Sequence, residues 1–191
     1  MSVAASGAIA LPTVGSSVAY TWGSTRAERE APFPCDRHLA DADEALFRAV
    51  DVDAPPVVIF RWLCQLKAAP YSYDWIDNFG RESPRQLTPG LEQLAVGQRV
   101  MGGFLLVEFE CDQHLTVVTQ APPLEALFGT FAVSYVVVPR GAERARLVVK
   151  TLARYARGPL GLATRWLWPW GDLVMMRKQL LTLKHLAETT E

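Results

Sequence analysis

The chain has too few cysteines and histidines, too widely spaced, for a structural metal site or a disulfide framework. Its 191 residues include three cysteines, Cys35, Cys64 and Cys111, and no two of them form a Cys-x-x-Cys pair. The three histidines are also far apart in the sequence. We therefore predict no metal and no cofactor, with ordinary buried or half-buried thiols in a reduced, cytoplasmic setting.

Signals for secretion or membrane insertion are missing as well. No Lys or Arg precedes Arg26, and Pro12 and Gly15 interrupt the apolar residues before it. A secretory signal needs a positive start and an unbroken apolar stretch, and a membrane span needs ~18 apolar residues in a row. We expect a small-residue arm over residues 1–19, followed by one soluble, intracellular domain over 20–191.

The charge balance excludes a further class of partner. Nineteen Lys and Arg against twenty Asp and Glu give a net charge of -1, which offers no overall attraction for nucleic acid. The sequence also contains no Gly-x-Gly-x-x-Gly loop, no Walker-type phosphate loop and no Gly-x-Ser-x-Gly motif. Nucleic acid is therefore not an expected partner, and the sequence leaves the oligomeric state open.

What the chain does have is aromatic residues: six Trp, five Tyr and eight Phe, within a sequence that is 50% hydrophobic. A chain of this length buries roughly 70% of its unfolded surface, so it can build a core without disulfides. Much of the aromatic content lies in two clusters, Trp62 to Phe79 and Trp166 to Trp170. These aromatic side chains are expected either to fill the core or to line a cavity.

Two regions between residues 57 and 80 predict helices. Residues 57–66 place Val58, Trp62 and Leu66 four residues apart on one face, after the prolines that suit a helix start. Residues 71–80 predict a shorter second helix that Gly80 closes. Residues 81–98 contain two prolines and two glycines and predict a polar connection.

The next segments have apolar residues that repeat with a period of two, which is typical of strands. The segments rich in Val, Phe, Leu, Tyr and Thr are 104–110, 114–120, 131–138 and 145–155, and 46–52 is a shorter first strand. Short links such as 111–113 and 139–142 are hairpin connections, so the sheet is predicted to be antiparallel.

A long amphipathic helix is predicted over residues 172–188, with Asp172 as its N-cap. Its apolar stripe runs through Leu173, Met176, Leu180 and Leu183. The order of elements therefore predicts an α+β fold in which one curved antiparallel sheet wraps around the C-terminal helix. A strongly curved sheet cannot contact a helix everywhere, and the space left between them is typical of a ligand pocket.

Several segments resemble the SRPBCC superfamily, the START-like, polyketide cyclase/dehydrase-like proteins with a helix-grip fold, and more narrowly its bacterial members. The most specific are Trp62-Leu63-Cys64-Gln65-Leu66 and Tyr71-Ser72-Tyr73-Asp74-Trp75. The matching segments run from about residue 20 to 188, and the sequence departs from the pattern at residues 166–170. The resemblance implies a deep hydrophobic cavity under the last helix. It implies no fixed catalytic set, because the superfamily ranges from lipid carriers to cyclases.

The first functional hypothesis is a non-enzymatic or weakly catalytic binder of a hydrophobic small molecule, such as a lipid, polyketide or terpenoid. The side chains proposed for the cavity wall are Trp62, Gln65, Tyr71, Tyr73, Trp75, Phe104, Leu106, Tyr135, Met176 and Leu180. Gln65 or Tyr135 would orient the ligand. The alternative is a cyclase, aromatase or dehydratase that uses the same cavity, with Glu108, Tyr135 or Arg48 as the ionisable group.

Structural roles compete with each functional interpretation. The aromatic residues near Trp62 could be core packing, and Glu108 with Glu110 could be solvent-facing charges on one face of a strand. Even-numbered basic residues from Arg144 to Arg154 alternate with apolar ones, which predicts a solvated outer face.

The aromatic segment before the last helix also has two interpretations. Trp166, Trp168 and Trp170 could pack before the helix or form a lid over the cavity, which is the favoured hypothesis. They could instead contact a membrane surface.

Overall fold

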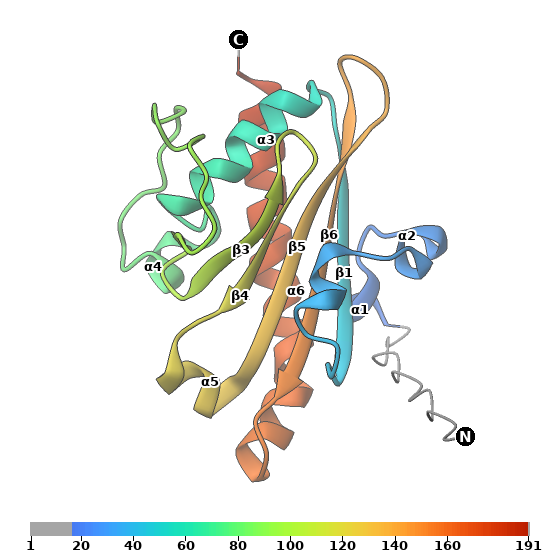
Figure 1. The fold of residues 1–191 in the computed structure, drawn as a ribbon, viewed down its shortest axis with the longest axis vertical. Coiled ribbons are helices and arrows are strands. Elements are labelled where there is room, and N and C mark those ends of the chain that lie inside the picture. Colours follow the sequence, from blue (N-terminus) through green and yellow to red (C-terminus); the bar gives the residue numbers. More distant parts are fainter. Residues whose placement is uncertain (1–16, 191) are drawn as a thin grey trace, which may run out of the picture.

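The computed structural model describes residues 17–190, so most of the predicted arm, residues 1–16, lies outside the described part. A six-stranded antiparallel sheet with the order β1-β6-β5-β4-β3-β2 curves around the long helix α6 (Figure 1). The strands are β1 (Glu44–Val52), β2 (Arg99–Val100), β3 (Phe104–Glu110), β4 (His114–Thr119), β5 (Gly129–Pro139) and β6 (Ala145–Tyr155). The predicted α+β helix-grip architecture is confirmed.

The helices occupy the N-terminal region, the connections and the inner face of the sheet. They are α1 (Val18–Thr21), α2 (Arg26–Glu30), α3 (Pro56–Cys64), α4 (Asp74–Asp77), α5 (Pro122–Phe128) and α6 (Pro159–Glu188), with 3₁₀ turns η1 (Pro34–Arg37) and η2 (Gln65–Lys67). The predicted helix after Pro55 is α3, and its last predicted turn is η2. The second predicted helix is only the four-residue α4.

Helix α6 begins at Pro159, thirteen residues before the predicted start at Asp172. The sequence suggests a break because Pro169 lacks the amide hydrogen that an interior helical position donates. The structure accommodates Pro169 inside the helix, where it is buried, and the aromatic residues around it become helical. Asp172 is therefore not an N-cap: it lies within α6 and pairs with Arg48 on β1.

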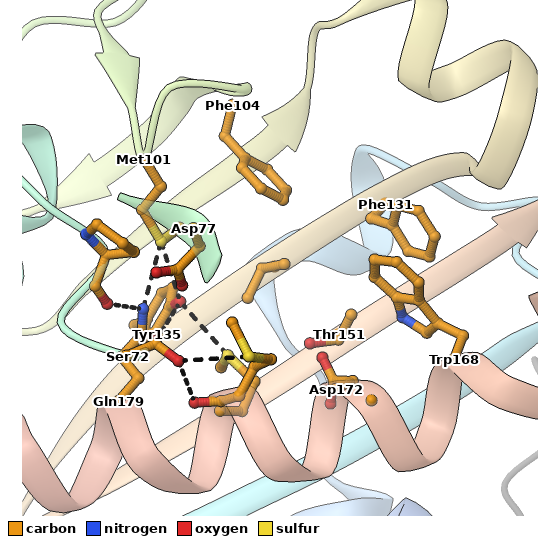
Figure 2. A pocket seen from close by; sticks show the side chains of 15 residues that line it. Ser72, Asp77, Met101, Phe104, Phe131, Tyr135, Thr151, Trp168, Asp172 and Gln179 are labelled. Atoms are coloured by element: carbon orange, nitrogen blue, oxygen red, sulfur yellow. Dashed lines mark hydrogen bonds between the residues drawn. The ribbon is translucent and has the colours of Figure 1, made fainter. Parts of the chain in front are cut away.

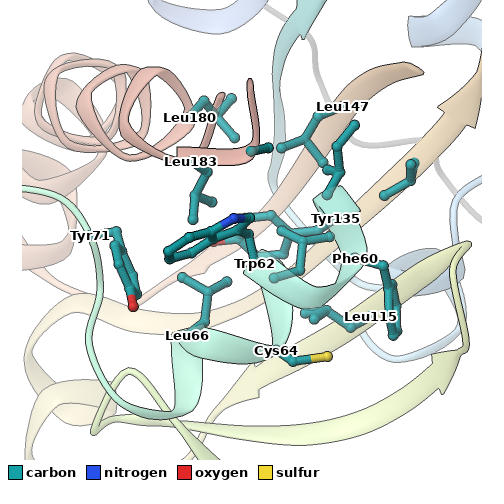
Figure 3. Close-up of a cluster of buried hydrophobic side chains, with 14 of the residues drawn as sticks. Phe60, Trp62, Cys64, Leu66, Tyr71, Leu115, Tyr135, Leu147, Leu180 and Leu183 are labelled. Carbon is teal, nitrogen blue, oxygen red and sulfur yellow. The ribbon is translucent and has the colours of Figure 1, made fainter. Parts of the chain in front are cut away.

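The core lies between the inner face of the sheet and the helices α3 and α6 (Figure 3). Trp62 of α3 is at its centre, edge-to-face with Tyr71 at 6.0 Å between ring centroids, and Leu180 and Leu183 pack on it from α6. The indole Nε1 of Trp62 donates to Thr190 Oγ1 over 2.9 Å, which ties α3 to the end of the chain. This end of the sheet is filled.

The middle of the outer face of β6 is covered, which corrects the prediction of solvation for two of its basic residues. Arg144 and Arg154 are exposed, but Arg146 and Lys150 are buried beneath the segment that contains α2 and η1. Arg146 pairs with Glu28, and Lys150 Nζ lies 2.5 Å from Asp36 Oδ1. The alternation of basic and apolar residues along β6 does not reveal that α2 and η1 cover this face and supply the acidic partners.

Candidate functional site

A cavity of about 330 Å³ lies between the sheet and the middle of α6, near α4 (Figure 2). Residues of β5 and β6 form one wall and residues of α6 form the other. The apolar residues that line it are Pro70, Met101, Phe104, Phe131, Val133, Trp168, Met175 and Met176. Its volume is at the lower end of the range of about 300–1,000 Å³ that small-molecule sites occupy.

Trp168 closes one end of the cavity. Its indole stacks on Phe131 of β5 with ring centroids 4.0 Å apart and an interplanar angle of 16°. Phe128 of α5 lies against the same indole, with centroids 6.3 Å apart. The helical extension of α6 before Asp172 therefore supplies an aromatic wall to the site.

A short hydrogen-bonded chain marks the other end. Tyr135 of β5 donates from its hydroxyl to Gln179 Oε1 over 2.8 Å, and Gln179 Nε2 donates to the carbonyl of Pro70 over 2.6 Å. Burial raises the pKa of Tyr135 well above its ordinary value, so the hydroxyl stays protonated. This arrangement fixes the tyrosine ring against the cavity.

A buried ion pair lies behind the α6 wall. Arg48 of β1 is fully buried, and its Nη2 lies 2.7 Å from Asp172 Oδ2. The same guanidinium donates to the backbone carbonyls of Ala19 and Phe47 over 2.7 and 2.8 Å. Burial raises the pKa of Asp172, and the nearby Arg48 charge opposes that rise. Asp172 lines the cavity, whereas Arg48 supports it from behind.

Three polar atoms in the cavity wall have no hydrogen-bond partner within the described protein: Thr151 Oγ1, Asp77 Oδ1 and Trp168 Nε1. Each is shielded from solvent, and Thr151 is only 2% exposed. Burial raises the pKa of the Asp77 carboxyl, and a hydrogen bond from Ser72 opposes that rise. Buried polar groups are nearly always paired, so three orphans around one cavity require an explanation.

Three of the ten predicted wall residues, Phe104, Tyr135 and Met176, line this cavity. Five others lie in the packed core beside it, namely Trp62, Gln65, Tyr71, Leu106 and Leu180. Gln65 does not orient anything in the cavity, because its amide bonds to the backbone of Thr88 on the 81–98 connection. Tyr73 is half-buried outside the cavity wall, and Trp75 is 75% exposed.

The three candidate ionisable groups occupy three different environments. Tyr135 lines the cavity, and Arg48 is buried behind Asp172. Glu108 lies outside the cavity and contacts Arg37 at 2.7 Å and His38 at 2.9 Å. Burial would raise the pKa of Glu108, but the hydrogen bond from His38 and the charge of Arg37 outweigh it and lower the pKa. The structure thus gives Glu108 ion-pair partners and no contact with the cavity.

Sequence reasoning missed most of the polar wall, including Ser72, Asp77, Thr151, Asp172 and Gln179. Only Thr151 had a local signal, because it is a polar residue on the face of β6 that carries Leu147 and Val149. Asp77 and Gln179 reach the cavity through the packing of α4 and α6, which no local pattern encodes.

The three tryptophans before Asp172 do not act together. Trp168 faces the cavity, whereas Trp166 and Trp170 are 77% and 55% exposed on the outside of α6. Leu162, Leu167 and Val174 are exposed on the same helix. Among residues 17–190, no helix is both long enough and apolar enough to cross a membrane.

Comparisons with known proteins give matches of structure. No family model matches this chain, and no curated protein matches it significantly by sequence. A protein from Arthrobacter aurescens superposes with a TM-score of 0.50 and 12% identity over 76% of this chain and 87% of that chain.

Two solved structures described as aromatase/cyclases are also similar. The Zhui aromatase/cyclase from Streptomyces sp. R1128 gives a TM-score of 0.49 and 14% identity over 76% of this chain and 93% of that chain. The di-domain ARO/CYC BexL from the BE-7585A biosynthetic pathway gives a TM-score of 0.48 and 16% identity over 77% of this chain and 50% of that chain. Together with the sheet order, the Arthrobacter likeness establishes the fold alone: this chain has the helix-grip fold that the sequence resemblance implied.

Proposed function

We propose that this protein binds a hydrophobic small molecule in the cavity between β5, β6 and α6. The observation that carries the proposal is the unfilled space itself. The core beside it is packed with Trp62, Leu180 and their neighbours, whereas the apolar side chains around the cavity leave about 330 Å³ empty. A concave, mostly apolar space with a few polar groups in its wall is typical of a small-molecule site.

The wall suits an adaptable apolar contact surface. Three methionines, Met101, Met175 and Met176, line the cavity with Phe104 and Phe131. Methionine side chains are flexible and polarisable, and they adjust to ligands of different outline. Burial of apolar ligand surface would contribute roughly 25 cal/mol per Å² before the cost of ordering the ligand.

The test is to fill the cavity from within. The apolar fluorophore N-phenyl-1-naphthylamine is titrated into wild type, into Val133→Phe and into Val138→Phe. Val133 faces the cavity, whereas Val138 packs on the outer face of the same strand. We expect saturable binding to wild type and Val138→Phe, and at least tenfold weaker binding to Val133→Phe. Equal binding by all three proteins, or none by wild type, would contradict the proposal.

A second proposal is a cyclase-type reaction in the same cavity. One observation favours it: Asp172 and Tyr135 place a carboxyl and a phenol in the wall of an apolar site, and burial raises the pKa of both. A carboxyl whose pKa is raised can act as a general acid or base. Turnover of a linear poly-β-ketone by wild type, lost in Tyr135→Phe or Asp172→Asn with ligand binding retained, would support this proposal; no turnover would exclude it.

A further inference from the structure

The polar atoms of the cavity wall form two separate groups. Thr151, Asp172 and Trp168 lie together at one end, and Asp77 lies at the other, near Tyr135 and Met101 (Figure 2). Asp172 and Gln179 are seven residues apart on α6, so the wall between the two ends spans about 10 Å of helix. Val133 lies between Phe131 and Tyr135 on β5, and Met176 lies between Asp172 and Gln179 on α6, so both contribute apolar surface between the two ends.

The unpartnered atoms at the two ends have different hydrogen-bonding capacities. Trp168 Nε1 can only donate, and the Thr151 hydroxyl can donate and accept, so this end suits a hydroxyl or carbonyl oxygen. The unpartnered Oδ1 of Asp77 accepts, so the opposite end suits a hydroxyl or an amine. An unpaired buried polar group is unfavourable, and a ligand group that pairs with it removes that cost.

The charge of the wall restricts the ligand further. The residues that line the cavity include two carboxyls, Asp77 and Asp172, and no Lys, Arg or His. The buried Arg48 does not line the cavity, and its two terminal nitrogens are paired with Asp172 and with backbone carbonyls. A ligand carboxylate would lose its hydration and meet no cation, which is strongly unfavourable in an apolar site.

We propose, on the basis of the binding function above, that the cavity selects an elongated ligand that carries no negative charge, with an apolar middle and a polar group at each end. A hydroxyl or carbonyl oxygen pairs with Thr151 and Trp168, and a hydrogen-bond donor pairs with Asp77. The site therefore discriminates against fatty acids and other apolar carboxylates, which share the hydrophobic surface but carry a negative charge.

Three probes with one ring system test this selection: anthracene, 2,6-dihydroxyanthracene and anthracene-2-carboxylate, titrated at pH 7 by their fluorescence. We expect the dihydroxy compound to bind at least tenfold more tightly than the carboxylate, with anthracene between them. A carboxylate that binds as tightly as the dihydroxy compound would overturn the selection and leave the cavity-binding function intact. Failure of all three probes would contradict the binding function itself.

Two threonine variants test whether the Thr151 hydroxyl pairs with the ligand. Thr151→Val removes a hydroxyl with no partner, so we expect an unchanged or higher unfolding midpoint, several-fold weaker binding of 2,6-dihydroxyanthracene and unchanged binding of anthracene. The control is Thr116→Val, whose buried hydroxyl lies 2.8 Å from Ser134 Oγ and outside the cavity. It should lower the midpoint and leave both affinities unchanged. Wild-type affinity of Thr151→Val for the dihydroxy probe would overturn this assignment.

The Asp77 end is tested by Asp77→Asn, which keeps the shape of the side chain and removes its negative charge. We expect the preference for the dihydroxy probe over the carboxylate to shrink several-fold. A preference equal to that of wild type would show that Asp77 does not take part in the selection.

Discussion

Arg48 on β1 and Asp172 on α6 form a buried ion pair, with Nη2 and Oδ2 2.7 Å apart, that joins one edge of the sheet to the helix it grips. The pair fixes the rotation of α6 within the stretch from Trp168 to Gln179 that lines the cavity. Breaking a buried pair leaves an uncompensated charge, whereas removing both partners does not.

The first prediction is a double-mutant cycle on this pair. Arg48→Met should lower the free energy of unfolding by about 3–5 kcal/mol, and so should Asp172→Leu. The double variant should be less destabilised than the sum of the two, because neither charge is then left unpaired. Urea unfolding of the four proteins measures this coupling. Strictly additive losses of stability would show that Arg48 and Asp172 do not stabilise each other.

The second prediction concerns acid stability and the Glu28–Arg146 pair, in which Arg146 Nη2 donates to Glu28 Oε2 over 3.1 Å. Burial would raise the pKa of Glu28, but hydrogen bonds from Arg146 and from the Thr25 backbone outweigh it and lower the pKa. A carboxylate with a lowered pKa in the folded protein stabilises it above its unfolded pKa, and this stabilisation is lost as pH falls through the folded pKa.

Glu28→Gln should therefore be less stable than wild type by about 2 kcal/mol at pH 7. The difference should shrink as the pH falls below the ordinary glutamate value of 4.5. Denaturant unfolding from pH 7 to pH 3 measures it, with Glu30→Gln, in the exposed pair with Arg26, as the control that changes little. A stability difference that stays constant down to pH 3 would show that the ionised Glu28 carboxylate does not stabilise the folded protein.

The third prediction compares two glycines in α6. A Cβ on Gly161 would lie 1.6 Å from the carbonyl oxygen of Ala156, so Gly161→Ala requires the backbone to move and should cost about 1–3 kcal/mol. A Cβ on Gly171 meets nothing within 4 Å, so Gly171→Ala should stabilise the helix by about 0.5–1 kcal/mol. Thermal unfolding should move the two midpoints in opposite directions; a shift of both in one direction would be evidence against this helix geometry.

The fourth prediction separates the cysteines by reactivity. Burial raises the pKa of Cys35 to about 11 and that of Cys64 to about 12, whereas Cys111 is exposed. The thiolate is the reactive form, so one thiol per chain should react rapidly with a disulfide reagent in native buffer and three in denaturant. Rapid reaction of two or three thiols in the native protein would show that the core around Cys35 or Cys64 is open.

The sequence predicted five of the six strands and their antiparallel pairing because apolar residues repeat with a period of two and several of the links are short; it missed the two-residue β2. It placed the start of the last helix too late because Pro169 has a strong local preference against a helix interior. Burial of Pro169 and the stacking of Trp168 on Phe131 are tertiary contacts that favour the longer helix. Local propensity carries no information about either contact.

The structure has a pocket between the sheet and the last helix, where the sequence placed its expected cavity, but most of the residues that line it were not predicted. Trp62 and Tyr71 pack into the core, since α3 lies against β5 and α6, whereas Trp75 is exposed. The polar residues that line the cavity come from four segments far apart in the sequence, and only folding brings Asp77, Thr151 and Asp172 around one space.

The most direct test of ligand binding uses the methionines. The chain has four, and Met101, Met175 and Met176 all line the cavity. With the methionine methyl groups labelled with carbon-13, saturation by N-phenyl-1-naphthylamine should shift these three methyl resonances through the ring currents of the bound probe. The same addition to Val133→Phe should leave them in place. Saturable probe binding that shifts none of the three resonances would contradict a ligand in this cavity.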